Sequence, residues 1–223
     1  MHFFEIMKKT IIYIDGYNLY YGLLKNNPRG KWLDLKSFVA SLLRPDHEIA
    51  AVKFFTARIR PYPYDIAAVE RQKIYLQALS SFDKIQICEG FYNKNKVWLP
   101  LLNEKCKSCS ESRNGMARVV KFEEKRSDVN MAVSAMIDAA RTDAECFVLI
   151  TGDSDQVGTI EALRYEFGKK VLVFNPHAAV SDHLKRAASY YSHIPVDLPE
   201  SCRLPDSIVM PNNRILHCPL AWM

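Results

Sequence analysis

Four aspartates in three short segments are of a type and spacing that could form one anionic site. Asp15 directly follows a short apolar run, Asp153 and Asp155 follow a second one, and Asp128 lies in a charged segment before that second run. In open parallel sheets, ligands bind beyond the carboxyl ends of the strands. If the two apolar runs are neighbouring strands, all four carboxylates therefore meet in one pocket.

The chemistry expected of such a pocket is that of a hard divalent cation. Carboxylates held close together repel one another, so they must either take up protons or share a cation. Mg²⁺ or Mn²⁺ suits an all-oxygen site, whereas zinc prefers His and Cys. A bound ion can activate water and stabilise charge on a phosphate during in-line displacement. We expect the four aspartates to hold the metal, and the catalytic set to be Asp15, Asp128, Asp153, Asp155 and Asn18.

Each acid also has a purely structural interpretation. Asp153 or Ser154 could cap the helix that follows, and the helix macrodipole favours Asp128 in a first turn. Asp15 could belong to a turn with the glycine after it. The joint placement of the acids at the ends of elements favours a shared site over three separate coincidences.

A phosphodiester substrate also requires cations near the acids, because RNA brings its own negative charge. Basic and hydroxyl side chains occur beside the acidic segments, and the expected substrate-binding residues are Lys125, Arg126, Ser154, Thr151 and Arg58. Tyr17, Tyr20 and Tyr21 could stack on the bases of single-stranded RNA, although packing is the favoured interpretation. His177 and His183 are expected to be ordinary polar residues of the last helical region.

Hydrophobic periodicity predicts the elements that position these residues. Short apolar runs alternate with longer amphipathic segments, as in parallel strands joined by crossover helices. We therefore expect an α/β fold, a three-layer sandwich around a central, mostly parallel five-stranded sheet. The expected strands are residues 11–14, 50–57, 84–88, 146–150 and 170–174. The expected helices are residues 35–43, 64–79, 127–140, with a Ser cap and an apolar face at Val129, Val133, Met136 and Ala140, and 156–167, which Gly168 stops.

One basic segment interrupts this pattern. Residues 94–126 hold nine Lys or Arg and four Asp or Glu, which accounts for the whole formal net charge of +5 of the 223-residue chain. Residues 90–122 fit neither the helical nor the strand period, so we expect an insertion that forms a β-hairpin or a long loop. An anionic partner is expected near this segment.

The insertion also contains Cys106 and Cys109, which have the spacing of half a zinc site. A closed structural site needs four ligands, and no second such pair follows nearby. Cys88, His217 and Cys218 could complete it only if the C-terminal segment folds back. The sequence therefore leaves zinc open and favours free thiols.

The remaining boundaries follow from composition. Five of the 11 prolines lie after residue 194, so we expect one domain at 9–194 and a proline-rich tail at 195–223. The tail is expected to pack on the body or to dock a protein partner. No secretory signal and no apolar stretch of about 20 residues is found, which favours a cytoplasmic protein with reduced thiols and no membrane association.

The three acidic segments carry a resemblance to a known family. They read YIDGYN (13–18), KRSDV (125–129) and TGDSD (151–155). In order and spacing they resemble the three blocks of the NYN domain, in the LabA-like branch of the PIN-like nucleases, over roughly residues 9–190. This resemblance implies a parallel α/β sandwich, a divalent-metal site at the four aspartates and metal-dependent RNA cleavage. Asn18 falls on the Asn of the first block and Ser154 on the small polar residue of the third.

Three functions remain after these observations. The first is a ribonuclease that uses Mg²⁺ or Mn²⁺. The second is a catalytically silent module that binds RNA or a protein through the insertion and the tail, and the third is a small-molecule phosphohydrolase with a closed pocket. The four acids favour catalysis, and the concentrated basic segment favours a polyanionic substrate. The sequence leaves open whether the protein forms a homodimer.

Overall fold

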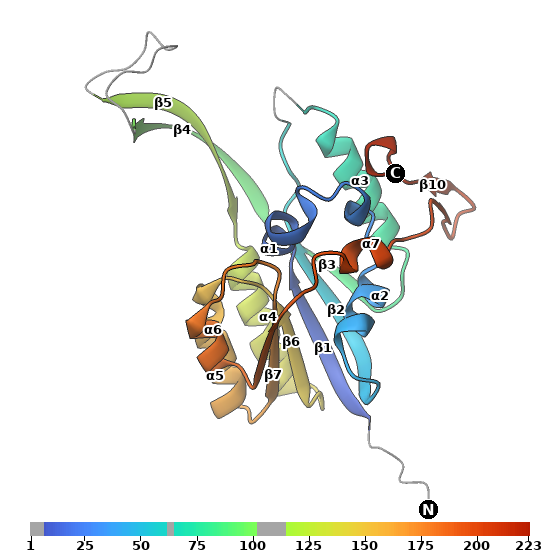
Figure 1. Cartoon of the computed structure of the whole chain (residues 1–223), viewed down its shortest axis with the longest axis vertical. Helices are drawn as coiled ribbons and strands as arrows, with labels where there is room; N and C mark the ends of the chain where they lie inside the picture. Colours follow the sequence, from blue (N-terminus) through green and yellow to red (C-terminus); the bar gives the residue numbers. More distant parts are fainter. Residues whose placement is uncertain (1–6, 62–64, 102–114) are drawn as a thin grey trace, which may run out of the picture.

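The centre of the computed structural model, which describes residues 7–61, 65–101 and 115–223, is a six-stranded parallel sheet (Figure 1). Its strands lie in the order β3-β2-β1-β6-β7-β8, and every neighbouring pair is parallel. The strands are β1 (Lys8–Asp15), β2 (His47–Thr56), β3 (Ile85–Glu89), β6 (Cys146–Ile150), β7 (Lys170–Asn175) and β8 (Tyr190–His193).

The prediction of five strands is wrong, because the sheet has a sixth, β8, at its edge. β8 pairs with β7 alone, from Leu172 opposite Tyr190 to Asn175 opposite His193. An edge strand needs no continuous apolar run, since only part of it is covered. Tyr190 is 51% exposed, and the segment has only four residues, two of them Ser and His. Hydrophobic periodicity therefore carried no signal for it.

Alternating side chains of the strands build one apolar core on each face of the sheet. In β1, Ile12 and Ile14 point to one face, and Ile11 and Tyr13 point to the other. The first face is covered by α1 (Gly16–Leu19), the π-helical turn η1 (Tyr20–Leu24), α2 (Leu35–Leu42) and α3 (Ala68–Leu79). The second is covered by α4 (Ser127–Arg141), α5 (Val157–Tyr165) and α6 (Asp182–Ala187). The result is the expected sandwich of helices, sheet and helices.

Helix α4 forms where it was predicted, but of the four residues expected on its apolar face only Met136 packs against the core. Met131, Ala135 and Ala139 are buried against the sheet. Val129 and Val133 are 66% and 51% exposed. Small alanines allow a helix to approach a sheet closely, and the larger valines point outward. The helical spacing of apolar residues therefore indicated the helix but not which of its faces packs against the sheet.

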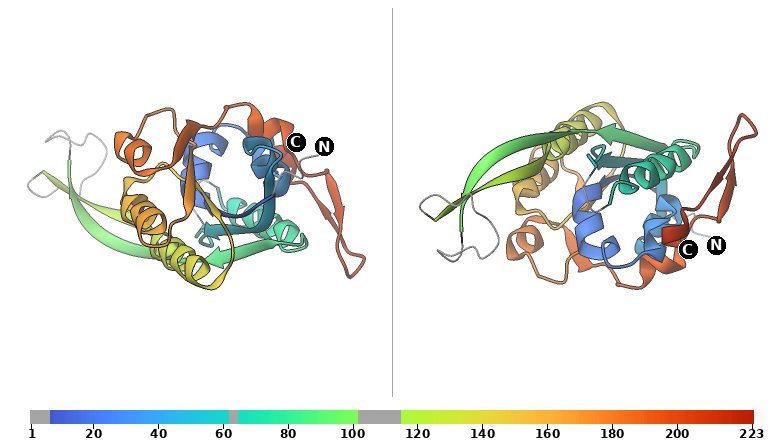
Figure 2. Two further views of the ribbon diagram at one scale, coloured as in Figure 1. Left: turned by 90° about the horizontal axis from the view of Figure 1, so that it is seen from below. Right: turned by 90° about the horizontal axis from the view of Figure 1, so that it is seen from above.

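The basic insertion contains a two-stranded antiparallel ribbon, β4 (Phe91–Pro100) and β5 (Met116–Lys125). Figures 1 and 2 show that it extends away from the sheet. Strand β5 continues three residues past the expected end of the insertion and leads directly into α4. Cys106 and Cys109 lie outside the described residues, so the question of whether they bind zinc stays open.

The C-terminal segment packs on the first face of the sheet. It contains the short elements α7 (Leu198–Ser201), β9 (Ser207–Val209), β10 (Ile215–His217) and η4 (Leu220–Trp222). Cys202, Leu204 and Leu216 join the main core. The β9–β10 hairpin projects on the side of the body opposite to the β4–β5 ribbon (Figure 2).

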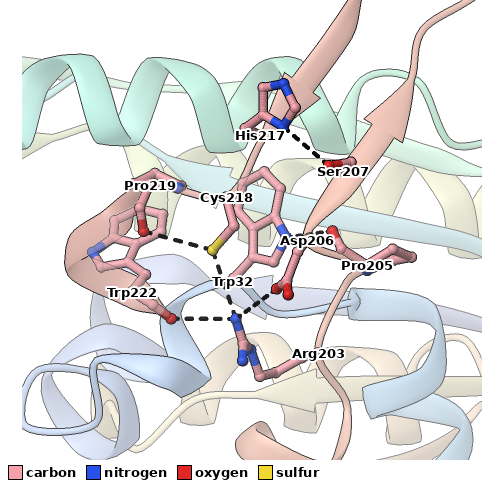
Figure 3. A network of polar contacts seen from close by, with 9 residues as sticks. All are labelled: Trp32, Arg203, Pro205, Asp206, Ser207, His217, Cys218, Pro219 and Trp222. Atoms are coloured by element: carbon pink, nitrogen blue, oxygen red, sulfur yellow. Dashed lines mark hydrogen bonds and ion pairs between the residues drawn. The ribbon is translucent and has the colours of Figure 1, made fainter.

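A polar network holds this segment in place (Figure 3). The Trp32 indole donates to the Pro205 carbonyl at 2.8 Å. The Arg203 guanidinium donates to Asp206, to the Cys218 thiol and to the Trp222 carbonyl at 3.3, 3.6 and 3.3 Å. Trp32 directly follows a short turn, η2 (Arg29–Lys31), so the network joins the two halves of the chain. Within the described residues, no helix is long and apolar enough to span a bilayer.

Candidate functional site

The site lies where the strand order reverses. The chain moves outward from β1 through β2 to β3, then returns to place β6 on the other side of β1. Ile14 pairs with Ile150, so Asp15 and Thr151 follow at the same level of the sheet. This is the topological switch point, where open parallel sheets leave a crevice for ligands. The condition that the two acidic strands be neighbours is met.

Asp15 is buried and fully hydrogen-bonded at this point. It is 4% exposed. Its Oδ1 accepts from the backbone N–H groups of Tyr17 and Asn18 at 3.1 and 3.0 Å, which caps α1. Its Oδ2 accepts from the Asn18 amide at 2.6 Å and the Thr151 hydroxyl at 3.1 Å. Burial raises the pKa of Asp15, and these hydrogen bonds oppose that rise. Four donors occupy the four lone-pair positions that a carboxylate offers.

A second layer of side chains fixes Asn18. The Asn18 Oδ1 accepts from the Gly152 N–H at 3.1 Å and lies 3.0 Å from the His177 Nε2. The backbone N–H of His177 donates to the Asn175 Oδ1 at 2.8 Å. Gly152 has no space for a side chain, since a Cβ would stand 2.7 Å from both the Asn175 Oδ1 and the His177 Cδ2. The site thus extends to the end of β7.

The expected place of His177 in the last helical region is wrong. The residue lies in the loop after β7, not in a helix, and contacts a residue of the predicted catalytic set. His183 is exposed on α6, as an ordinary polar residue would be. The signal that could have found Asn175 and His177 was present: both are polar residues at the end of a buried strand, as Asp15 and Asp153 are.

Asp153 and Asp155 follow β6. Asp153 caps the short 3-10 helix η3 (Ser154–Gln156) by accepting from the Asp155 N–H at 3.0 Å. Its own N–H donates to the Thr151 hydroxyl at 3.1 Å. The structural interpretation of Asp153 as a cap is thus confirmed, and it places the residue beside the site. Ser154 and Asp155 are exposed.

Asp128, near the start of α4, lies within the field of the other acids. Burial and the charges of Asp15, Asp153, Glu124 and Asp155, in that order, raise the pKa of Asp128 to about 6. Glu124 is a further acid of the site that was not predicted, although it lies in the same charged segment as Asp128. Its carboxylate accepts from the Ser127 hydroxyl, and burial raises its pKa.

The start of α4 differs from the expected Ser cap. Ser127 is the first helical residue, and the residue before it, Arg126, is in the left-handed conformation with φ 80°. The Ser127 hydroxyl is directed back to Glu124 and forms no cap. This arrangement turns the chain sharply from β5 into α4.

The predicted phosphate-binding cations have protein partners. Lys125 pairs with Glu123 at 3.1 Å. The Arg126 guanidinium lies 4.7 Å from the centre of the Phe91 ring. Arg58 donates to both oxygens of Glu89 at 2.8 and 2.6 Å. A substrate would compete with these contacts, most of which are exposed and therefore weak.

The donor set suits a hard divalent ion in its chemistry, because it consists of carboxylates. The side chains do not surround an ion as they stand: among the described residues, no three Asp, Glu, His or Cys side chains form a group that could hold a metal. Asp15 in particular has no free lone pair. Binding would require Asp128, Asp153 or Asp155 to turn inward, or water to bridge them.

A cavity of about 340 Å³ adjoins this site. Its lining begins at Gly16 and Tyr17, directly after Asp15. The Tyr92 side chain also lines it and lies within the field of Glu124. The cavity and the acids therefore share α1 and the β4–β5 ribbon as walls.

Comparison with known proteins gives a family. The chain is 30% identical over 237 residues to 6-hydroxy-3-succinoylpyridine 3-monooxygenase HspA of Pseudomonas putida, and the match covers 96% of this chain and 75% of that protein. A solved protein of unknown function from Vibrio parahaemolyticus, VPA0982, is similar with a TM-score of 0.48 and 18% identity, over 88% of this chain and 98% of that one. The model of the NYN domain matches residues 9–195. This chain belongs to the NYN domain family.

Proposed function

We propose that this protein hydrolyses phosphodiester bonds of RNA with Mg²⁺ or Mn²⁺ at the acid cluster, as a PIN-like nuclease of the LabA-like branch. The observation that carries the proposal is the pair of hydrogen bonds, Thr151 to Asp15 and Gly152 to Asn18, that ties the ends of β1 and β6 together. It fixes the acidic segments around the switch point. NYN domains are typically nucleases, which supports the reaction class.

The residues have separate roles in this proposal. A bound ion would polarise the phosphate and lower the pKa of a water molecule. Asp128, Asp153 and Asp155 hold it, directly or through water. Asp15 adds charge and orients Asn18, whose amide it accepts at 2.6 Å. Asn18 in turn accepts from the Gly152 N–H and so links the end of β1 to the loop after β6.

Binding of the substrate involves the groups that surround the acids. The Thr151 hydroxyl keeps Asp15 and Asp153 in register, and the exposed Ser154 is available to a phosphate oxygen. Lys125, Arg126 and Arg58 supply positive charge at the rim after exchanging their protein partners for phosphate. A single-stranded substrate is proposed because unpaired bases can contact the nearby tyrosines.

The test is cleavage of end-labelled single-stranded RNA with Mn²⁺, with and without a chelator. The variants Asp128→Asn and Asp153→Asn should each lower the rate by at least about tenfold. The matched control is Asp83→Asn, which removes the same charge from an exposed residue before β3, at the opposite end of the sheet. Equal rates for the wild type and all three variants would refute the proposal. Binding of RNA without cleavage, insensitive to chelation, would instead indicate the silent module.

A second candidate function is hydroxylation of a pyridine-type ring. It is favoured by the identity with the named monooxygenase along almost the whole chain and by the aromatic cavity beside the acids. In a monooxygenase reaction, one atom of O₂ enters the substrate, and the other becomes water with two protons and two electrons from an external reductant such as NADH.

The two candidate functions differ in whether the protein consumes O₂ and NADH. We expect no oxygen uptake above background with NADH and 6-hydroxy-3-succinoylpyridine, with or without added flavin. Stoichiometric loss of O₂ and NADH, with a hydroxylated product in mass spectrometry, would establish the second function. The same preparation is assayed for cleavage of RNA, so that nuclease and monooxygenase activity are compared in a single sample.

A further inference from the structure

Seven of the 19 residues that line the cavity beside the acids carry aromatic rings. They come from α1, η1, β2, α3, β4 and the C-terminal turn η4, and they are Tyr17, Tyr20, Tyr21, Phe54, Tyr75, Tyr92 and Trp222. Tyr17 lies 5.4 Å from Tyr21 and 5.8 Å from Tyr92, between ring centres, at tilted angles. A volume of about 340 Å³ is in the range of cavities that hold small organic ligands.

The polar lining of the cavity is positively charged. Lys25, Lys31 and Arg71 line it together with one acid, Asp65. Arg71 pairs with Asp65, which neutralises both. The net charge of two therefore rests on the lysines.

Lys31 is the cation that most needs an anionic partner. It is half-buried, and burial and the neighbouring Arg71 lower its pKa. Across residues 7–61, 65–101 and 115–223 its ammonium makes neither a hydrogen bond nor an ion pair, and it lies 5.6 Å from the centre of the Tyr20 ring. The charge of Asp65 opposes this shift, but Asp65 itself pairs with Arg71. A partly buried ammonium that makes no direct ion pair with the described residues is costly, and a bound anion would lower that cost.

We propose that this cavity binds a planar heteroaromatic ring that carries an anionic group, with the ring among the tyrosines and the anion at Lys31. Such a ring can be the base of a nucleotide or a free pyridine carboxylate, since both offer a π face and a negative charge. Aromatic side chains bind bases by stacking on them, so several rings in one cavity favour a planar ring as the ligand. The proposal does not depend on which reaction the acids catalyse.

The C-terminal segment is part of this binding site. Trp222 lines the cavity, with its ring centre 6.2 Å from Tyr75 and 6.4 Å from Trp32. The Arg203 guanidinium holds the Trp222 carbonyl at 3.3 Å, as Figure 3 shows. The tail therefore closes a pocket and is not only a cover for the core.

The test is isothermal titration calorimetry on the full chain with two series of probes. The first is UMP, uridine and inorganic phosphate, and the second is nicotinate and nicotinamide. In at least one series we expect the anionic ring to bind about tenfold more tightly than its neutral counterpart, with phosphate alone weaker still. The series that binds identifies the source of the ring. Binding of phosphate as tight as that of UMP, or no heat from any probe, would overturn the proposal.

Two variants assign the binding to this cavity. Lys31→Gln should weaken binding of the anionic ring about tenfold and leave binding of the neutral ring unchanged. Trp222→Leu should weaken binding of both rings. Lys185→Gln, the same change on exposed α6, serves as the control. Asp153→Asn should bind the anionic ring as tightly as the wild type does. The binding result therefore stands whether or not the protein cleaves RNA. Circular dichroism checks that the variants fold. Binding unaffected by Lys31→Gln and Trp222→Leu would place the ligand elsewhere.

Discussion

At the scale of single residues, the site depends on side chains that make two contacts each. The Thr151 hydroxyl donates to Asp15 and accepts from the Asp153 N–H, both at 3.1 Å. It is wholly buried, so neither contact can be replaced by bulk water. Because one oxygen joins the end of β1 to the loop after β6, its loss affects both acids together.

Replacing Thr151 by Val should therefore destabilise the protein and impair its reaction. The side chain keeps its shape, but the Asp15 Oδ2 keeps only the Asn18 amide of its two donors, and the Asp153 N–H loses the hydroxyl that accepts its hydrogen bond. We expect the free energy of unfolding in urea to fall by about 1–3 kcal/mol. Thr151→Ser keeps the hydroxyl and should recover most of the RNA cleavage that Thr151→Val loses. A Val variant with unchanged cleavage would show that this hydroxyl does not position the acids.

The glycines of the β6–α5 segment should respond in opposite directions to the same change. Gly152→Ala forces a Cβ to within 2.7 Å of Asn175 and His177, so we expect a loss of about 1–3 kcal/mol. Gly158→Ala, at an exposed position of α5, meets no atom within 4 Å and should stabilise the helix by about 0.5–1 kcal/mol. Thermal unfolding of the two variants measures the difference. Equal midpoints for the two would contradict the close packing around Asn18.

His47, at the start of β2 and the end of the sheet away from the acids, predicts a pH dependence of stability. Its side chain is 5% exposed and lies 2.8 Å from the Thr10 hydroxyl. Burial lowers its pKa below 6.5, an effect that Asp46 opposes and that Lys8, Lys170 and Arg44 reinforce. The unfolded chain then binds a proton near pH 6.5 that the folded protein binds only at lower pH. Stability is therefore lost as pH falls below about 6.5, by at most about 1.4 kcal/mol per pH unit.

The measurement is urea unfolding at pH 7.5 and 5.5 for the wild type and His47→Gln. The variant should lose less stability between these two pH values than the wild type. Because the raised pKa of Asp128 acts in the opposite sense over this range, the comparison between the two proteins decides the outcome. A His47→Gln variant that loses as much stability as the wild type between these pH values would contradict this assignment.

At the scale of elements, the sequence predicted the strands that are buried on both faces. It did not predict the packing of elements that have one face open to solvent. The strands β1, β6 and β7 are continuous apolar runs, since both faces of each are covered by helices. The edge strand β8 and the buried face of α4 left weaker patterns, because their packing depends on neighbours that lie far away in the chain. The ribbon β4–β5 showed no clear period, since Tyr92 is the one buried residue of its two strands.

The ribbon has one face that combines cations with apolar side chains. Lys94, Lys96 and Trp98 lie on it, opposite Phe122, Val120 and Arg118 of the partner strand, and both strands alternate their side chains between the two faces. Trp98 and Val120 are 45% and 46% exposed. Such a face can contact both the phosphates and the bases of a single strand.

Replacing Lys94, Lys96 and Arg118 together by Gln should weaken binding of single-stranded RNA in a salt-dependent way. Each phosphate that the variant no longer neutralises should reduce the slope of log K against log salt by about 0.7. Fluorescence anisotropy with labelled RNA at several salt concentrations measures that slope.

The control for the ribbon is a second triple variant with the same loss of charge. Lys36, Arg141 and Lys185 lie on α2, α4 and α6, outside the ribbon, and their change to Gln should leave the slope nearly unaltered. Equal slopes for both triple variants would show that the total charge matters and the ribbon does not.

At the scale of the whole molecule, the positions of the acids could be predicted because they follow from strand order. Once β1 and β6 are neighbours, Asp15 and Asp153 must meet at one edge of the sheet. Asn175 and His177 were missed although they follow a predicted strand, β7, as Asp15 and Asp153 follow theirs, and Glu124 was missed because its position depends on the sharp turn from β5 into α4. The aromatic cavity was missed for a similar reason, since its walls come from both ends of the chain.

The tail provides the last prediction, because the fold makes it part of the body. Cys202, Leu204 and Leu216 belong to the same core as the sheet, and the Trp32 indole holds the Pro205 carbonyl. A protease site inserted at the exposed Val196, 73% accessible between β8 and α7, should therefore be cut while the cleaved tail stays bound. Gel filtration should show one peak that contains both fragments in buffer and two peaks in denaturing urea. The nicked protein should unfold at a lower temperature than the intact chain, because the cut allows the tail to gain entropy on release. A tail that dissociates in buffer and leaves a folded body would show instead that residues after 196 are a separable segment.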